Sequence, residues 1–193
     1  QSEESVNVAN LPTTPIAVNS RHQTIANATG VPARVIAAFS AVESAGSANV
    51  VRFECNKFND GAAAASVQPM PCTIAEGVSF SRTASETNLS AFMTAYQRNK
   101  ELAVKSTSFG SYQVMGDTAL RVTGLGAEEF WQQFNSDPIA LSDRIVIGWF
   151  GERPDAVTAA RNLNWRELTK KYNGPGQVSY YAPRLENAYN RAA

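Results

Sequence analysis

The sequence is poor in charge and in residues that mark metal or nucleic-acid sites. Only 18% of the 193 residues are charged, and 17 Lys plus Arg balance 17 Asp plus Glu, so the formal net charge is zero. Broad nucleic-acid binding needs clustered positive charge, and this balance argues against it. No apolar run approaches about 18 residues, which argues against a membrane-spanning helix. One histidine and two cysteines without a CxxC pair are poor zinc ligands, so no metal or cofactor is expected.

The rest of the composition is that of one globular domain. Apolar residues make up 44% of the chain, enough for a sizeable core. Apolar spacing predicts a mainly α fold with a small β or irregular insert near 50–82, where 50–54 is extended and 59–82 irregular. Residues 1–18 are predicted to form a polar N-terminal arm. Predicted helices cover 19–30, 32–44, 86–104 and 110–123, one opens at Asp137-Pro138, short ones follow Asp155 and Asn164, and the last covers 179–192.

The two cysteines, Cys55 and Cys72, are predicted to form a disulfide, because the segment between them looks loop-like and needs a tether. Such a bond closes a loop of roughly 17 residues and contributes about 3 kcal/mol if unstrained. Two buried thiols are the alternative. A disulfide implies an oxidising compartment. The chain begins at Gln1 rather than Met, and a cleaved signal peptide, a maturation cut and a shortened sequence all fit this start. We expect an exported protein.

Glu43 is the first candidate for chemistry. It lies near the C-terminal end of the apolar helix predicted at 32–44, just before Ser44-Ala45-Gly46. The negative end of the helix dipole and the hydrophobic face both disfavour the ionised carboxylate, so we expect a raised pKa. A glycosidase needs such a proton donor at neutral pH. The alternative interpretation is a solvated glutamate at a helix end.

Two further stretches carry polar and aromatic groups beside glycines. The first runs from Ser108 through Phe109, Gly110 and Gln113 to Gly116, and Gln113 can both donate to and accept from a sugar. The second is Tyr172-Asn173-Gly174-Pro175-Gly176, where a tyrosine ring and hydroxyl suit a sugar ring. Taken alone, the first stretch is also typical of a helix start and the second of a helix stop.

In this order the motifs resemble the lysozyme superfamily, and most closely the N-acetylmuramidase domain of phage endolysins and related cell-wall hydrolases. The resemblance covers residues 42–189 and implies a lysozyme-like fold for a single catalytic domain at 19–193, with an insertion around 60–104. It is carried by Val42-Glu43-Ser44-Ala45-Gly46, by Arg52 to Phe58, by Ser108 to Gly116, and by Tyr172 to Gly176 with Tyr181 and Leu185 to Tyr189.

The resemblance also implies roles for individual residues. Glu43 is the expected general acid for the β-1,4 bond between N-acetylmuramic acid and N-acetylglucosamine. Glu54 matches the Phe-Glu position of the second motif and is the second expected catalytic residue. Where the family usually carries Arg-His, this chain has Cys55-Asn56, so a histidine role is lost there. The residues expected to line the sugar cleft are Ser108, Phe109, Gln113, Tyr172 and Asn173.

The second carboxylate decides the reaction. An inverting hydrolase needs a base roughly 6.5–9.5 Å from the acid, and a retaining one a nucleophile at about 5–5.5 Å. The candidates are Glu54 and Asp60, then Glu76 or Asp117. Without such a group, the substrate's N-acetyl group can assist and give the 1,6-anhydro product of a lytic transglycosylase. The motifs are also compatible with a non-catalytic glycan-binding or virion domain and with a chitinase-like enzyme.

The expected partners are peptidoglycan glycan strands, with a delivery assembly and an immunity or inhibitor protein as further candidates. A monomer that acts in the periplasm or at the bacterial cell wall, after secretion or phage delivery, is expected. Lone His22 is predicted to be structural or exposed, and Trp149 to lie in the core. Trp131 and Trp165 are left open as sugar-stacking residues.

Overall fold

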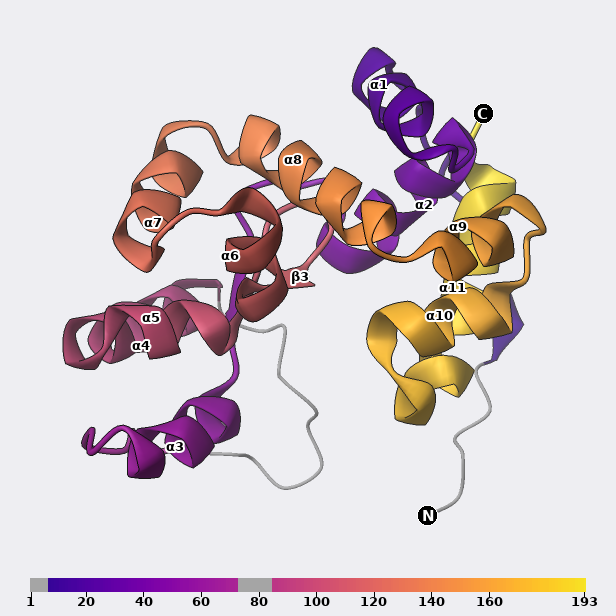
Figure 1. The fold of residues 1–193 in the computed structure, drawn as a ribbon. Helices are drawn as coiled ribbons and strands as arrows, with labels where there is room; N and C mark the ends of the chain where they lie inside the picture. Colours follow the sequence, from indigo (N-terminus) through magenta and orange to yellow (C-terminus); the bar gives the residue numbers. More distant parts are fainter. Residues whose placement is uncertain (1–6, 73–84) are drawn as a thin grey trace. The chain divides into compact units, whose positions relative to one another are not determined.

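The structure, a computed structural model, describes residues 7–72 and 85–193, with the side chains of 85–87 left out (Figure 1). The chain forms two compact units, of which unit 1 comprises Gln1–Gly46 and Val146–Ala193, and unit 2 comprises Ser47–Ile145. The elements of unit 1 are η1 (Val8–Asn10), α1 (Ser20–Thr29), α2 (Ala33–Ser44), α9 (Pro154–Arg161), α10 (Trp165–Asn173), η2 (Pro175–Gln177) and α11 (Val178–Arg191). Those of unit 2 are β1 (Val51–Phe53), α3 (Cys55–Ala64), α4 (Ser85–Arg98), α5 (Lys100–Lys105), β2 (Thr107–Phe109), β3 (Val114–Met115), α6 (Gly116–Thr123) and α7 (Ala127–Ser136). The division falls within α8 (Pro138–Gly151).

Helix α2 is the core helix of unit 1. Its residues from Val35 to Ser40 are all buried, and it packs against α1 and α11. The helix ends as expected near Gly46, whose N–H donates to the Ser40 carbonyl at 3.1 Å. Pro32 precedes the helix as its N-cap rather than forming its first residue. Because α2 stops at Ser44, Glu43 lies in its last turn.

Part of the predicted N-terminal arm is paired with the C-terminus. Ile16 forms a parallel bridge with Ala192, and its N–H donates to the Arg191 carbonyl at 3.0 Å. The Arg191 guanidinium donates to the Thr14 carbonyl at 3.0 Å. Residues 14–18 are therefore extended and fixed to the end of α11.

Unit 2 contains a three-stranded antiparallel sheet in the order β1-β2-β3, which pairs Arg52 with Ser108 and Ser108 with Met115. The helix expected at 110–123 is wrong in its first half, because 110–115 form a hairpin and only 116–123 are helical. Gly110 has a φ of +78°, and a Cβ there would lie 2.1 Å from the Ser142 hydroxyl. The positive φ is incompatible with a right-handed helical turn at Gly110, and the close approach to Ser142 of α8 leaves no room for a side chain there.

Three other expectations for unit 2 need correction. The irregular segment predicted at 59–82 is helical up to Ala64, because Phe58 and Ala62, one turn apart in α3, are both fully buried. Residues 65–72 are irregular, and residues 73–82 lie outside the described residues. The helix predicted at 86–104 breaks at Asn99, whose side chain accepts the Leu102 N–H and caps α5. Helix α7 was not predicted.

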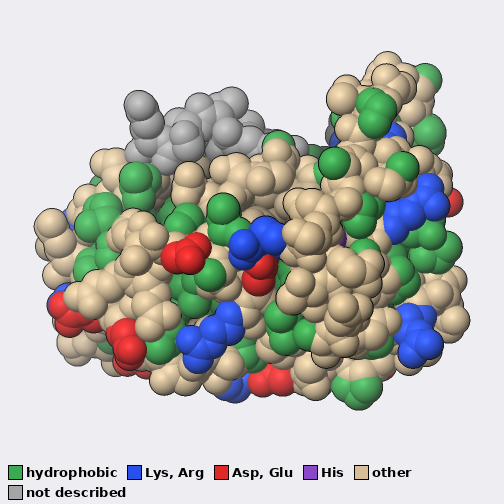
Figure 2. All heavy atoms as spheres, turned by 90° about the horizontal axis from the view of Figure 1, so that it is seen from above, with side chains coloured by type: hydrophobic (Ala, Val, Ile, Leu, Met, Phe, Trp, Pro, Cys, Tyr) green, Lys and Arg blue, Asp and Glu red, His purple; other side chains and the backbone are tan. Residues whose placement is uncertain are grey.

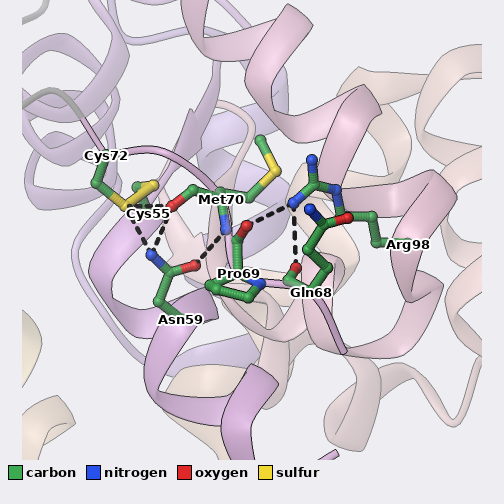
Figure 3. Close-up of a disulfide and its surroundings, with 7 residues drawn as sticks. All are labelled: Cys55, Asn59, Gln68, Pro69, Met70, Cys72 and Arg98. Atoms are coloured by element: carbon green, nitrogen blue, oxygen red, sulfur yellow. Dashed lines mark hydrogen bonds between the residues drawn. A yellow bond between two sulfur atoms is a disulfide. The ribbon is translucent and has the colours of Figure 1, made fainter. Parts of the chain in front are cut away.

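The predicted disulfide between Cys55 and Cys72 is confirmed, and two polar side chains brace the segment that it closes (Figure 3). The Asn59 amide donates to the Met70 carbonyl at 2.8 Å and accepts the Met70 N–H at 2.7 Å. Arg98 donates to the carbonyls of Gln68 and Pro69. These contacts fix residues 68–72 beside the start of α3.

Candidate active site

Glu43 is buried and holds a hydrogen bond that the sequence did not predict. Its side chain is only 5% exposed, and the Asn173 amide nitrogen donates to its Oε1 at 2.9 Å. Asn173 is the last residue of α10, and 130 positions of the chain separate the two partners. The structure therefore brings together an expected acid and an expected sugar-binding residue within unit 1.

Aromatic packing positions the Tyr172–Asn173 end of α10 against α2. Phe39, one helical turn before Glu43, has its ring centroid 4.4 Å from that of Tyr172. The Trp149 ring lies 4.7 Å from Tyr172 on another side. Trp149 is 5% exposed, so the prediction that it belongs to the core is confirmed. Because Tyr172 is held by two rings, the following residue, Asn173, reaches the Glu43 carboxylate.

The Asn-Gly-Pro-Gly sequence ends α10, as its turn signal predicts. Gly174 has a φ of +92°, which favours glycine, and η2 follows directly at Pro175–Gln177. The stop sets Asn173 at the C-terminal end of the helix, where its side chain meets the last turn of α2.

Glu54 occupies a different setting, at the junction of β1 and α3 in unit 2. It is half-buried, and its N–H donates to the Ser106 carbonyl at 2.8 Å. Burial raises the pKa of its carboxyl, Lys57 and Arg52 oppose that rise, and the negative charge of Asp117 adds to it. Lys57 also lies 3.8 Å from an Asp117 oxygen, so Glu54 belongs to a small network of charges.

Ser108 and Gln113 lie in the β2–β3 hairpin and are both largely buried. The Ser108 hydroxyl donates to the Met115 sulfur at 3.0 Å. Gln113 has a φ of +51°, and its amide nitrogen donates to the carbonyls of Val50 and Gly110 at 3.0 and 2.9 Å. Its Oε1 is buried and has no hydrogen-bond partner among the described residues. Gln113 therefore braces the hairpin with its donor side and keeps one unused acceptor.

Phe109 lies in the core of unit 2. Its ring is 1% exposed and packs against the rings of Phe92, Phe130 and Phe134 at centroid distances of 5.0 to 5.7 Å. The structure thus places this expected sugar-binding side chain inside an aromatic cluster, away from solvent. Half-buried Trp131 stacks on Phe134 at the edge of the same cluster.

Comparison with protein-family models gives a match to the family described as N-acetylmuramidase, over residues 32–193. The chain belongs to the N-acetylmuramidase family. The predicted resemblance is thereby confirmed, and membership supports a peptidoglycan-degrading glycosidase in general terms. A comparison with curated proteins finds no significant match.

The mainly α, lysozyme-like fold is also confirmed by a solved structure. The crystal structure of the Burkholderia AP3 phage endolysin superposes with a TM-score of 0.64 at 19% identity, covering 89% of this chain and 68% of that chain. At this identity the likeness concerns the fold alone. In both proteins, therefore, very different sequences reach the same helical arrangement.

The remaining predicted residues of this muramidase-family chain fall in varied places. Asp60 and Asp117 are exposed, and Glu76 lies outside the described residues. His22 is structural, since its Nδ1 accepts the Asn19 N–H at 3.1 Å, and burial together with Arg21 lowers its pKa. Trp165 packs against Tyr189. Over residues 7–72 and 85–193, no three His, Cys, Asp or Glu side chains gather as a metal site would require.

On the face shown in Figure 2, neither the positive nor the negative side chains gather into a broad patch. No single described helix is long and apolar enough to cross a membrane, and the pair α1–α2 reaches that length and composition only across a bend of 115°. Sequence reasoning missed the charge network of Lys57 and Asp117, because nothing in their spacing joins α3 to α6.

Proposed function

We propose that this chain is an N-acetylmuramidase that hydrolyses the β-1,4 bond between N-acetylmuramic acid and N-acetylglucosamine, with Glu43 as the general acid. The observation that carries the proposal is a carboxylate 5% exposed, in the last turn of α2, which accepts a hydrogen bond from Asn173. Family membership over residues 32–193 supports the substrate class. The proposal concerns the bond and the residues, which membership alone leaves open.

The Asn173 hydrogen bond orients the acid. A protonated carboxyl has one oxygen that accepts and one that donates. Because the amide nitrogen can only donate, its bond to Oε1 favours the proton on Oε2. The acid then passes this proton to the glycosidic oxygen as the C–O bond breaks, which lets N-acetylglucosamine leave as an alcohol.

Glu54 is the proposed base. It takes a proton from a water molecule whose oxygen attacks the anomeric carbon of N-acetylmuramic acid, so one water is consumed for each bond cut. A base is most effective when its pKa lies near the working pH, and burial raises the pKa of Glu54 in that direction. This environment supports hydrolysis over an intramolecular route that uses no base.

Sugar binding is assigned to polar residues of each unit separately. Tyr172 and Asn173 are half-buried, so each keeps exposed surface for a sugar. In the hairpin, Ser108 contributes a hydroxyl, and Gln113 braces the hairpin through its hydrogen bonds to the Val50 and Gly110 carbonyls. Phe109 is assigned a structural role in the aromatic cluster of unit 2 and no contact with the sugar. The disulfide supports action in the periplasm or at the cell wall after export.

The test is mass spectrometry of muropeptides released from purified peptidoglycan by the wild type and by Glu43→Gln. We expect fragments that end in reducing N-acetylmuramic acid, and a loss of roughly a thousandfold or more in the variant, since a general acid contributes about 10²–10⁴. The matched control is Glu186→Gln, which changes an exposed carboxylate of α11 in the same unit and should leave the rate unchanged.

Different products would identify different functions. Fragments lighter by one water show the 1,6-anhydro ends of a lytic transglycosylase and remove the base role of Glu54. Cleavage of chitin oligomers at the rate of peptidoglycan shows a chitinase-like enzyme. If wild type and Glu43→Gln release nothing and bind peptidoglycan equally, the chain is a binding domain and the proposal is wrong.

A further inference from the structure

Unit 2 contains an open groove of about 780 Å³ that none of the proposed catalytic and sugar-binding residues lines. Its lining residues come from helices α5 and α6, from residues 124–126 and from Ala127, the first residue of α7. Its volume falls within the range of about 300–1,000 Å³ typical of small-ligand sites. The lining consists of Glu101 and Lys105 from α5, Asp117, Leu120 and Arg121 from α6, and residues 124–127.

The lining is of mixed charge. Lys105 and Arg121 contribute two cations, and Glu101 and Asp117 contribute two carboxylates, with leucines between them. The Lys105 ammonium lies 2.7 Å from a Glu101 oxygen, and the side chains are 45% and 67% exposed, so this pair is open to exchange with a ligand. Such a groove suits a ligand that carries carboxylates, an ammonium group and short apolar side chains together.

Asp117 and Lys105 connect the groove to the surroundings of Glu54. Lys105 is next in sequence to Ser106, whose carbonyl accepts the Glu54 N–H at 2.8 Å. At the α6 wall, the Asp117 carboxylate pairs with Lys57 at 3.8 Å and acts electrostatically on Glu54. A ligand in the groove therefore contacts Asp117, a residue whose charge acts on the proposed base.

We propose that this groove binds the peptide stem of peptidoglycan and makes the enzyme prefer stem-bearing strands, an inference that rests on the proposed function. The stem is attached to the lactyl group of N-acetylmuramic acid, the sugar at which Glu54 acts. It carries backbone and side-chain carboxylates and, in strands with a diamino acid, a free ammonium. Lys105 and Arg121 bind the carboxylates, Glu101 binds the ammonium, and Leu120 contacts the alanine side chains.

The experiment compares two substrates made from one preparation, namely uncross-linked glycan strands with their stems, and the same strands after an amidase has removed them. The tested variant combines Lys105→Gln with Arg121→Gln. A matched control, Arg166→Gln, removes an exposed positive charge from α10 in unit 1. The initial rate of reducing-end release gives KM and kcat for each pair, and thermal unfolding checks that each variant is folded.

We expect the wild type to show a KM about tenfold lower on stem-bearing strands, the scale of one charge-assisted hydrogen bond. The double variant should lose this preference through a higher KM on stem-bearing strands, with kcat unchanged. On stripped strands its KM and kcat should equal those of the wild type. The control Arg166→Gln should keep the wild-type preference. Equal KM values of the wild type on both substrates would overturn the proposal. An equal rise in the KM of the double variant on both substrates would also overturn it. Failure of the proposed function looks different, because the wild type would then release reducing ends from neither substrate.

Discussion

The two carboxylates with proposed catalytic roles are positioned by opposite means. Glu43 belongs to a helix whose preceding turns are buried, and it accepts a hydrogen bond from a neutral amide on a distant helix. Glu54 starts a helix at the edge of a small sheet, half-exposed, among Lys57, Arg52 and Asp117. One glutamate is thus held by packing and a dipolar donor, and the other is tuned by neighbouring charges.

This difference matches the difference in proposed roles. An acid must keep its proton until the leaving oxygen takes it, and the Asn173 amide orients the Glu43 carboxyl by donating to one of its two oxygens. A base must exchange its proton with water, which half-exposure permits. The comparison predicts that substitutions in the two settings differ in kind as well as in size.

The largest effect on stability is expected from the frame that holds Glu54. Phe109→Ala removes a fully buried ring from the aromatic cluster of unit 2, and such truncations cost about 3–5 kcal/mol. Urea unfolding measures the loss. Phe109→Leu, which keeps most of the apolar volume, should lose less and retain KM. A raised KM in a fully stable Phe109→Ala protein would show that the ring contacts substrate after all.

The disulfide is expected to make the next largest contribution to the free energy of unfolding. Both cysteines lie in unit 2, the unit of Glu54, because unit 1 contains no cysteine. Cys72→Ser should lower the free energy of unfolding by about 3 kcal/mol, as expected for a cross-link over 17 residues. Urea unfolding of the wild type with and without reductant is the parallel measurement. Equal stability in both conditions would mean that Asn59 and Arg98 hold the loop without the bond.

The third test asks whether Glu54, which precedes α3, or Asp60, within α3, is the catalytic base. Glu54→Gln should lower kcat about a hundredfold, because a positioned base contributes about 10²–10⁴. Added azide should restore part of the rate, since an anionic nucleophile needs no base, and should give a glycosyl azide detectable by mass. Asp60→Asn changes an exposed carboxylate of α3 and should leave kcat nearly unchanged. The reverse ranking would assign the base to Asp60.

The smallest effect expected is a shift in the pH profile. As a base, Glu54 must be ionised, so kcat/KM falls as the pH drops through its pKa, which burial and Asp117 raise. Asp117→Asn removes a negative charge that favours the protonated form, and it also releases Lys57, so both changes lower the pKa of Glu54. The acid limb of the profile should therefore move to lower pH. If the acid limb does not move, a group other than Glu54 causes it.

The predictions from sequence succeeded where local signals and burial agree. Asn19 and Gly30 bound α1, and the turn after Asn173 ends α10, because capping and left-handed turn residues act over a few positions. They failed at 110–115, where hydrogen bonds from Gly110 and Gln113 to the distant Val50 carbonyl and pairing of β3 with β2 override local preference. They failed also at Asn99, whose cap interrupts an otherwise continuous apolar pattern. In each failure a distant partner or a single side chain outweighs the periodicity.

The family, the mainly α class, the cysteine pair and the position of Glu43 near a helix end could all be predicted from the sequence. Each depends on the order of motifs along the chain or on interactions between residues a few positions apart. Three facts became visible only in the folded chain: Asn173 donates to Glu43, Phe109 lies in the core, and the charges of Lys57 and Asp117 act on Glu54. These facts depend on contacts between residues tens to more than a hundred positions apart. Hydrogen bonds and ring packing act over a few ångströms in space, so separation in sequence does not reveal them.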